Sequence, residues 1–475
     1  MNNKSFYIIL LAFLSIASCN KDSNVKEGKH AFFGGEIINP FSDYIILSKS
    51  RKIIDTISLD KKNRFAYKLT DIDPGMYTFF DGKEAQTFLL EPNDSLLLRL
   101  NTFDFDESLV YTGIGAKENN FLIDLFLENE IEDGRVFRIS QLEPSEFEKE
   151  LTNYRDRNLK KLEQFNLKNK PTELFKEIAL ANINYRYYAN KELYPLAYYR
   201  KSERKNFNNL PDNFYDFREN VDYNNELLKN SEIYMTFLRF HINNVALQEH
   251  FKHSKDSVND ELSVDYNLDK LKVIDEKIDN KDIKNDLLNY TIIHFINISK
   301  NTDDYDVLLE SFKAKSTNKN HILRATRIVN SYKRLKPGQK IPSLTLLDSN
   351  DNEIELHSLI KKPTIIYFWA KKNKSRLIDS HKRAKELEVK YPEFNYIAIN
   401  TDSISYAEQT NILNRSELRI NNEYRFKFPE KSKDVLSIRP INKVFVVNKK
   451  QQIVNAKANM FNISFEQELL GLINQ

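Results

Sequence analysis

The chain of 475 residues contains a single cysteine, Cys19. It can therefore form no internal disulfide, and after Cys19 it has no thiolate to bind a metal or to enter a mixed disulfide. Thiol-dependent peroxide reduction is excluded on the same ground, because it also needs a thiolate nucleophile. The lack of cysteine thus removes the main classes of thiol redox enzyme.

The chain also has few glycines and a small net charge. Ten glycines are about 2% of the chain, against a usual value of about 7%, which disfavours glycine-cradled architectures. Gly113-Ile114-Gly115 lacks the third glycine and the following carboxylate of a dinucleotide fingerprint, and no Gly-x-Ser-x-Gly elbow occurs. Lysine and arginine (71) nearly balance aspartate and glutamate (68). We therefore expect no nucleic-acid partner, because such a partner needs a concentrated basic face.

The N-terminus has the pattern of an export signal. Residues 1–4 are a short basic segment, and residues 5–17 are an apolar run that is too short to span a bilayer. The small residues before Cys19 (Ser15-Ile16-Ala17-Ser18) resemble a bacterial lipobox. The resemblance implies that residues 1–19 are a lipoprotein signal peptide and that Cys19 carries the lipid. The alternative is an ordinary signal peptide with a chance cysteine.

A lipid-anchored protein is held at a membrane without spanning it. We therefore expect a protein of the bacterial cell envelope that contacts the membrane through the lipid on Cys19, with residues 20–30 as a polar tether. Lys21-Asp22 loosely resembles the charged surface-export signals of Bacteroidetes lipoproteins. Both the periplasmic face of the outer membrane and the cell surface stay open as locations.

Residues 31–115 are predicted to form an antiparallel β-sandwich. Short alternating runs such as Phe65–Leu69 and Met76–Phe80 are separated by breakers such as Asp73-Pro74-Gly75, and this spacing is typical of the architecture. The stretch from Ile54 to Leu122 also resembles the N-terminal domain of Bacteroidetes lipoproteins that carry a thioredoxin-like C-terminus.

Residues 116–333 are predicted to be a helical region that is held together mainly by its own apolar faces, because the apolar period changes to three or four. One apolar line consists of Phe121, Leu125 and Ile131, and another of Leu287, Ile292, Ile293, Phe295 and Ile296.

Two groups of side chains in this region have both a functional and a structural interpretation. The tyrosine-rich stretch Asn184–Phe217 is either a stacking platform for glycans or peptides or, as we favour, a helical hairpin whose tyrosines pack with solvated hydroxyls. His250 and His253 lie one turn apart and could share a metal. Neither a third ligand nor a supporting carboxylate is suggested nearby, so we expect an exposed pair and no metal.

Residues 334–475 are predicted to form an α/β domain. Thr364–Trp369 predicts a buried parallel strand, Ser375–Lys390 a helix, Phe394–Asn400 a second central strand and Phe465–Ile473 a closing helix. With the entry segment Leu335–Leu346, this pattern resembles the thioredoxin-like domain of TlpA/ResA-type thiol-disulfide oxidoreductases. The whole chain is thus expected to be an α+β multidomain protein, with a β-sandwich, a helical middle region and a thioredoxin-like domain.

In that family, a low-pKa thiolate at a helix N-terminus attacks a disulfide, and a thiol three residues later resolves the mixed disulfide. Aligned on Phe368-Trp369-Ala370, these two positions hold Asn373 and Arg376. Tyr367 stands where thioredoxins keep a buried carboxylate, and Pro440 matches the family's cis-proline. A nucleophilic pair of Ser375 with His381 is not expected, because His381 lies six residues further on and points away. We therefore expect no catalytic residue and no enzyme activity.

Cations crowd the start of the helix, where Asn373 is a candidate N-cap and the helix dipole is already positive. Free N–H groups and converging cations at a helix start can bind an anion. The loop is therefore either a solvated basic loop that drifted after redox selection ended, which we favour, or a contact site for an anion or acidic peptide. Its residues are Lys371, Lys372, Asn373, Lys374, Ser375, Arg376, Arg439 and Pro440.

The sequence thus predicts a membrane-anchored, redox-inactive binding or scaffold protein with no cofactor, whose partner is an envelope protein or peptide. Two alternatives stay open. One is an oxidoreductase-family protein that works with a cysteine-bearing partner. The other is a glycan- or peptide-binding module that uses the tyrosine-rich stretch.

Overall fold

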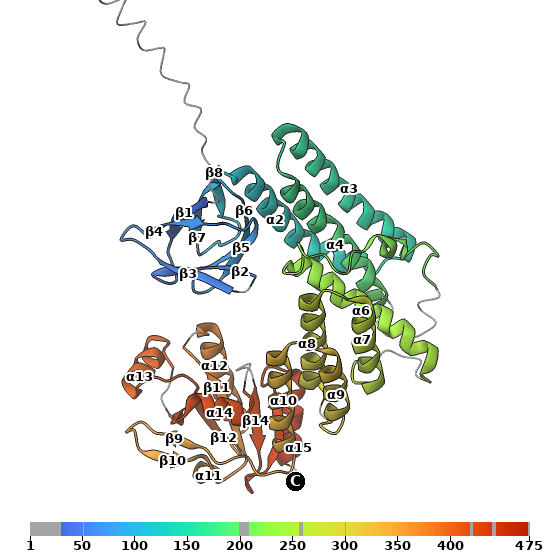
Figure 1. Ribbon diagram of the computed structural model, residues 1–475. Helices are drawn as coiled ribbons and strands as arrows, with labels where there is room; N and C mark the ends of the chain where they lie inside the picture. The colour runs from blue at the N-terminus through green and yellow to red at the C-terminus, as the bar shows by residue number, and fades with distance from the viewer. Residues whose placement is uncertain are drawn as a thin grey trace, which may run out of the picture. The chain divides into compact units, whose positions relative to one another are not determined.

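The computed structural model describes residues 30–50, 52–198, 209–255, 260–299, 301–371, 373–418, 421–438 and 443–473. These residues form a mixed α/β protein with several sheets and helices (Figure 1). They fold into two compact units. The first unit runs to Phe237 without residues 221–225, and the second consists of residues 221–225 and the chain from Leu238 onward.

The first unit begins with two four-stranded sheets, of order β4-β1-β7-β8 and β3-β2-β5-β6. The pairing of β1 with β7 is parallel and the other pairings are antiparallel, so the sandwich departs from the antiparallel prediction at that pair. The strands are β1 (His30–Ile38), β2 (Tyr44–Lys49), β3 (Lys52–Ser58), β4 (Arg64–Thr70), β5 (Gly75–Phe80), β6 (Ala85–Leu90), β7 (Ser95–Asn101) and β8 (Val110–Ile114).

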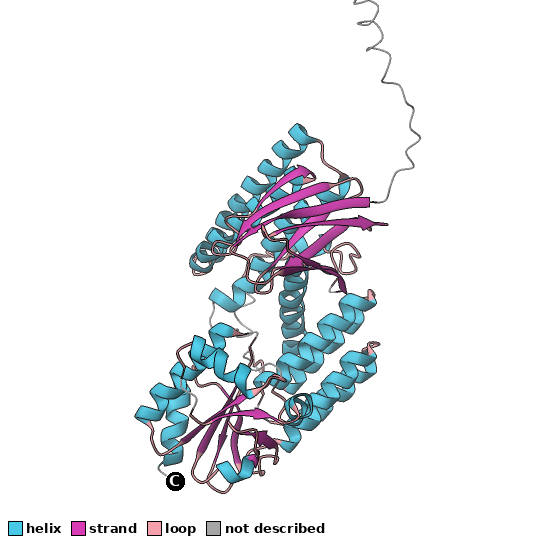
Figure 2. Cartoon of the chain, turned by 90° about the vertical axis from the view of Figure 1, so that its left-hand side faces the viewer, coloured by secondary structure: helices cyan, strands magenta, loops and turns pink. Residues whose placement is uncertain are grey.

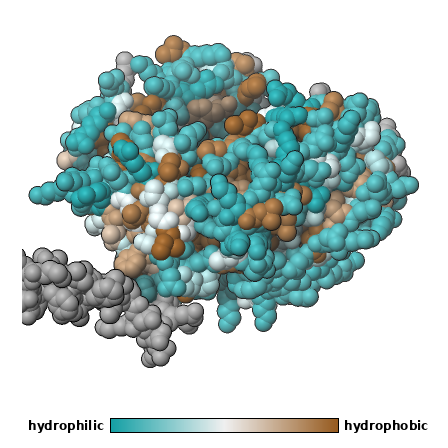
Figure 3. All heavy atoms as spheres, turned by 90° about the horizontal axis from the view of Figure 1, so that it is seen from above, coloured by the Kyte–Doolittle hydropathy of each residue, from teal (hydrophilic) through white to brown (hydrophobic). Residues whose placement is uncertain are grey.

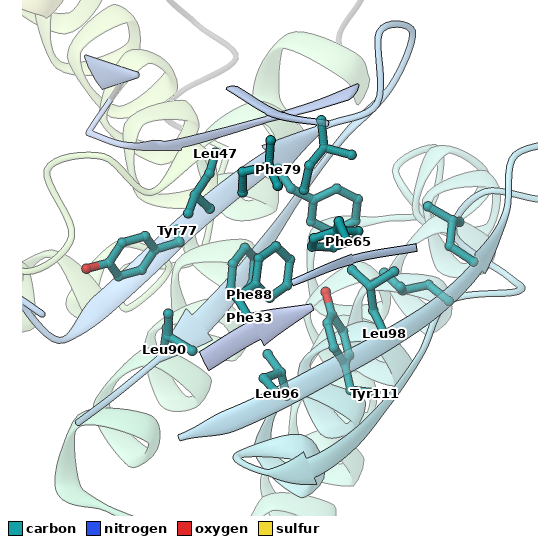
Figure 4. Close-up of a cluster of buried hydrophobic side chains, with 14 of the residues drawn as sticks. Phe33, Leu47, Phe65, Tyr77, Phe79, Phe88, Leu90, Leu96, Leu98 and Tyr111 are labelled. Atoms are coloured by element: carbon teal, nitrogen blue, oxygen red, sulfur yellow. The ribbon is translucent and has the colours of Figure 1, made fainter. Parts of the chain in front are cut away.

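Both sheets contribute side chains to one core (Figure 4). Strand β7 shows why the sequence alternates: Leu96, Leu98 and Leu100 are buried, and the residues between them are not. Across the core, the rings of Phe33 and Phe88 stack with centroids 4.2 Å apart. Burying a side chain of this size stabilises a fold by about 1.5–3 kcal/mol, so each buried residue of the alternating pattern contributes to the stability of the sandwich.

Gly113-Ile114-Gly115 forms the junction between β8 and helix α2 (Ala116–Ile139). Gly115 is the N-cap of α2 with a φ of 88°, a conformation that favours glycine, and a Cβ there would lie 2.8 Å from the carboxylate of Asp94. Strand β8 pairs antiparallel with β7 rather than in a βαβ unit. These glycines therefore serve a tight turn, and the exclusion of a dinucleotide fingerprint is confirmed.

The predicted helices are present, and they are divided between the two units rather than forming a body of their own. Leu125 is buried as expected, whereas Ile131 is largely exposed, so the first predicted apolar line is wrong at that residue. None of the helices in the described ranges is long and apolar enough to cross a bilayer. The helices after α2 are α3 (Pro144–Asn169), α4 (Glu173–Tyr198), η1 (Asp216–Asn220), α6 (Glu232–His253), α7 (Val264–Lys277), α8 (Lys281–Ile298), α9 (Tyr305–Lys315) and α10 (Lys319–Arg334).

The second unit contains a seven-stranded sheet of order β10-β9-β13-β12-β11-β14-β15 (Figure 2). Strand β11 lies near the middle, parallel to β12 and antiparallel to β14, and β12 is parallel to β13. The elements are β9 (Thr345–Leu347), β10 (Glu353–Glu355), α11 (Leu356–Leu359), β11 (Thr364–Trp369), α12 (Lys374–Lys390), β12 (Asn395–Asn400), α13 (Tyr406–Arg415), β13 (Glu423–Phe426), α14 (Pro429–Val435), β14 (Val444–Val447), β15 (Ile453–Ala458) and α15 (Ile463–Ile473).

The sheet is covered on both faces. All six residues of β11 are buried, as the continuous apolar run predicts for a strand between two layers. On one face, Trp369 belongs to the same core as Leu377 of α12 and Leu469 of α15. On the other face, Phe368 packs in a core with residues of α11 and the α14 region. The predicted central strands and closing helix are therefore confirmed, whereas α13 and β13 were not predicted.

On the face drawn in Figure 3, apolar side chains lie scattered among hydrophilic ones. Isolated exposed apolar residues are normal on a protein surface. We therefore place no binding surface on this face.

Candidate functional site

The predicted site lies where β11 ends and α12 begins. Asn373 is the N-cap of α12, and its side-chain oxygen accepts a hydrogen bond from the backbone N–H of Arg376 at 3.3 Å. The predicted N-cap is therefore confirmed. This bond satisfies one of the free N–H groups at the helix start, so the side chain occupies part of the place where an anion would bind.

Lys371 does not contribute a free cation to the loop. Its ammonium group forms an ion pair with Glu408 of α13, at 2.8 Å. Its backbone N–H donates to the carboxylate of Asp402 at 2.6 Å. These two acidic residues neutralise Lys371, so it adds little to an anion site.

Arg376 contacts an aromatic ring. Its guanidinium group lies 4.6 Å from the ring centroid of Phe461 and is partly buried, and this burial lowers its pKa. Such a cation–π contact holds the side chain against the domain. Of the five cations predicted to converge, Lys371 and Arg376 have described side chains, and these two contact Glu408 and Phe461. Lys372, Arg439 and Pro440, and the side chain of Lys374, lie outside the described residues.

Beneath the loop lies a buried polar network that sequence analysis missed. His381 of α12 and Glu423 of β13 are in contact, with Nε2 and Oε1 2.6 Å apart. The other carboxylate oxygen accepts a hydrogen bond from the indole N–H of Trp369 at 3.0 Å. Nδ1 of His381 lies 2.8 Å from the carbonyl oxygen of Leu377 and must therefore carry a proton.

This network bears on two sequence predictions, the absence of a Ser375–His381 pair and the place of Tyr367 at the position of a thioredoxin carboxylate. Both ring nitrogens of His381 are occupied by Leu377 and Glu423, and Ser375 is exposed, so the absence of a Ser375–His381 pair is confirmed. Tyr367 is buried, and its burial together with the negative charge of Glu423 raises its pKa well above the ordinary value. A buried carboxylate is thus present near Tyr367, but it comes from β13, which β12 separates from β11 in the sheet.

Two lysines are buried on the side of the sheet near α10. The ammonium groups of Lys443 and Lys457 lie 4.0 and 4.1 Å from the ring centroid of Tyr332. Lys443 donates to the carbonyl oxygen of Ser437 at 2.5 Å, and Lys457 donates to the hydroxyl of Tyr305 at 2.6 Å. Burial lowers the pKa of Lys443 to about 7, with a further contribution from Lys457, and burial lowers the pKa of Lys457 to about 8.

The tyrosine-rich stretch is described at residues 184–198 and 209–217, where its central rings are packed rather than open. Tyr187 and Tyr194 are buried, and the ring of Tyr194 stacks on Phe147 with centroids 4.1 Å apart. The hydroxyl of Tyr194 donates to the carbonyl oxygen of Leu142 at 2.6 Å, so the expectation of solvated hydroxyls is wrong for this residue. The packing interpretation is supported for these rings, which present no free face to a glycan. Tyr199 lies outside the described residues.

Buried charge also stabilises this stretch. Glu192 is fully buried and accepts two hydrogen bonds from the guanidinium group of Arg218, at 2.8 and 2.7 Å. A bidentate pair of this kind satisfies both partners in a dry environment. The charge of Glu192 therefore belongs to the internal packing of this region.

The histidine pair differs from its prediction. His250 is 2% exposed, because it packs beside the ring of Tyr266 with centroids 5.8 Å apart, so the expectation of an exposed pair is wrong for this residue. Asp269 of α7 contacts both histidines. The sequence could not indicate this third residue, because the carboxylate comes from the next helix. Cys19, the predicted lipidation site, lies outside the described residues.

Comparison with known proteins gives partial matches. No family model and no curated protein matches this chain. The thioredoxin domain of a thiol-disulfide oxidoreductase from Bacteroides vulgatus matches 30% of this chain and 99% of its own, with 16% identity and a TM-score of 0.25. A thioredoxin-like protein from Bacteroides caccae matches 60% of this chain and 93% of its own, with 15% identity and a TM-score of 0.33.

A thiol:disulfide interchange protein from a Bacteroides species matches 25% of this chain and 80% of its own, with 19% identity and a TM-score of 0.21. Several neighbours of this chain are thus thioredoxin-like thiol-disulfide oxidoreductases, matched over about 30% of its length.

Proposed function

We propose that this chain is a lipid-anchored protein of the bacterial envelope whose residues 334–475 form a thioredoxin-like domain without disulfide exchange. It binds or holds an envelope protein or peptide and catalyses no reaction. The observation that carries the proposal is the junction of β11 and α12. A buried strand leads into a capped helix there, and the two positions for sulfur hold Asn373 and Arg376.

The connections of the sheet support the thioredoxin-like part. Helix α12 connects the parallel strands β11 and β12, and the antiparallel pair β14–β15 precedes the closing helix α15. These are the connections that the resemblance of residues 334–475 implies. The absence of any cysteine after Cys19 supports the loss of redox chemistry.

We expect the purified chain to reduce insulin no faster than dithiothreitol alone, because it has no thiolate in the fold. The measurement is the insulin turbidity assay, made on Cys19→Ser protein so that the single thiol is removed. Reduction above the dithiothreitol background would refute the proposal.

A matched variant tests the geometry of the loop. The doubly substituted variant Asn373→Cys/Arg376→Cys places thiols at the N-cap and at the third helical residue, where the side chain and the backbone N–H are already in contact. We expect this pair to close an internal disulfide on oxidation, detected by loss of titratable thiol. If the two thiols remain free under oxidant, the loop lacks dithiol geometry and the thioredoxin-like part of the proposal fails.

The anchor is tested at Cys19. We expect the native chain to sediment with membranes and to incorporate labelled palmitate, because acyl chains hold it at the bilayer. Cys19→Ser should lose the label entirely and move from the membrane pellet to the soluble fraction. A variant that stays in the membrane pellet without label would show that another segment holds the protein there.

A further inference from the structure

Three side chains of the second unit converge at the end of α6. His250 and His253 lie on the last turns of α6, and Asp269 lies in α7 (Figure 1). Nδ1 of His250 is 2.9 Å from Oδ2 of Asp269, and Nε2 of His253 is 3.0 Å from the same oxygen. One ligand atom of each residue lies within 4.8 Å of those of the other two.

We propose that His250, His253 and Asp269 bind a divalent first-row transition metal ion of the zinc type. Two imidazole nitrogens and one carboxylate oxygen are a donor set that zinc accepts, with a fourth position left for water. Ligand atoms around tetrahedral zinc, with bonds of about 2.0–2.1 Å, lie about 3.3 Å apart. Both imidazole nitrogens are within about 0.4 Å of that separation from the carboxylate, so a small outward rotation of the side chains admits the ion.

The surrounding residues hold two of the three ligands in place. The ring of Tyr266 packs beside His250, and its hydroxyl donates to the carbonyl oxygen of Asn243 at 2.8 Å, which fastens α7 to α6. His253 is exposed, so solvent can reach the open coordination position. A bound ion would therefore join the end of α6 to α7 and stabilise the second unit by mass action.

The two lysines next to these ligands in sequence, Lys252 and Lys270, have partners of their own. Lys252, which lies between the two histidines in sequence, forms an ion pair with Glu249 at 2.6 Å. The ammonium group of Lys270 is directed to the ring of Tyr266, 4.1 Å from its centroid. Asp269 supplies the negative charge that faces the ion.

The proposal is tested by titrating the full chain with zinc chloride. The Cys19→Ser protein is used, because this change removes the only thiolate that could bind zinc elsewhere. After treatment with EDTA and dialysis, calorimetry should show one zinc ion bound per chain and a rise in Tm. Cobalt(II) in place of zinc should give a ligand-field absorption band in the same protein.

Three variants decide the assignment. His253→Gln and Asp269→Asn should each weaken zinc binding by about 100-fold or more, since even a residue that only orients a ligand contributes 10–100-fold. His294→Gln is the matched control, because His294 lies 3.8 Å from a single carboxylate, that of Glu261. This variant should bind zinc with the affinity of the wild-type chain. Circular dichroism confirms that each variant is folded, and exposed His253 is the safest substitution. The proposal would be overturned if the Cys19→Ser protein bound no zinc, or if all three variants bound zinc with equal affinity.

Discussion

Replacing Glu423 with leucine is expected to lower the free energy of unfolding of the second unit by about 3–5 kcal/mol, the usual cost of breaking a buried ion pair from one side. The carboxylate serves two buried donors at once, the indole N–H of Trp369 and the ring of His381. Leucine fills similar space but leaves both groups without a partner, and each such group costs about 1–3 kcal/mol.

The measurement is urea unfolding followed by tryptophan fluorescence. Trp369 is the only tryptophan of the chain and is fully buried beside Glu423, so its emission reports on this unit alone. Glu423→Gln is the matched control, because the amide keeps an acceptor for the indole and a donor for the imidazole, and we expect it to cost about 1 kcal/mol. If leucine is no more costly than glutamine, the network does not stabilise the domain.

A double variant separates the network from simple packing. His381→Leu combined with Glu423→Leu removes both buried polar groups, and such paired replacement is often neutral in a dry core. We therefore expect the double variant to be more stable than Glu423→Leu alone. Additive losses would show that the two side chains act independently.

The parts of this domain that the sequence predicts are those in which local pattern and environment agree. Thr364–Trp369 is a continuous apolar run and forms a strand buried on both faces. Asn373 stands before a helical run and caps it. Each of these predictions depends on neighbours within a few residues, which a sequence displays directly.

The missed parts depend on partners far away in the chain. Glu423-Tyr424-Arg425-Phe426 has the polar content of a surface segment, yet it forms a central strand, because Glu423 bonds to Trp369, 54 residues earlier. Arg425 is likewise buried and pairs with the turn at Asp351. A buried polar residue is recognisable only by its partner, and no local period identifies that partner.

The surroundings of the histidine pair and of the loop also depend on residues from other elements. His250 was expected to be exposed because the sequence suggests no third ligand or supporting carboxylate nearby, whereas it packs beside Tyr266 of the next helix. Lys371 was expected to join a basic cluster, whereas Glu408 of the unpredicted helix α13 neutralises it. A charge pattern along a sequence therefore does not show that Lys371 is neutralised by a residue on another element.

Buried lysines should make the stability of the second unit rise with pH. The pKa of Lys443 is about 7 and that of Lys457 about 8 in the fold, against an ordinary value of 10.5. Between the pKa values of the folded chain and that of the unfolded chain, the unfolded chain binds more protons than the folded chain. The free energy of unfolding therefore increases as pH increases. From pH 7 to pH 9 we expect a gain on the order of 3–4 kcal/mol, measured by Trp369 fluorescence in urea.

Lys443→Met is expected to raise stability at pH 7 and to flatten this pH dependence by about half, because methionine fills the space beside Tyr332 without a proton to lose. The lost hydrogen bond to Ser437 offsets about 1 kcal/mol of the gain. Lys449→Met, a change at an exposed lysine in the turn after β14, should keep the full slope. A slope equal to that of the native chain in Lys443→Met would mean that Lys443 titrates normally in the folded protein, and that the desolvation beside Tyr332 does not act on its charge.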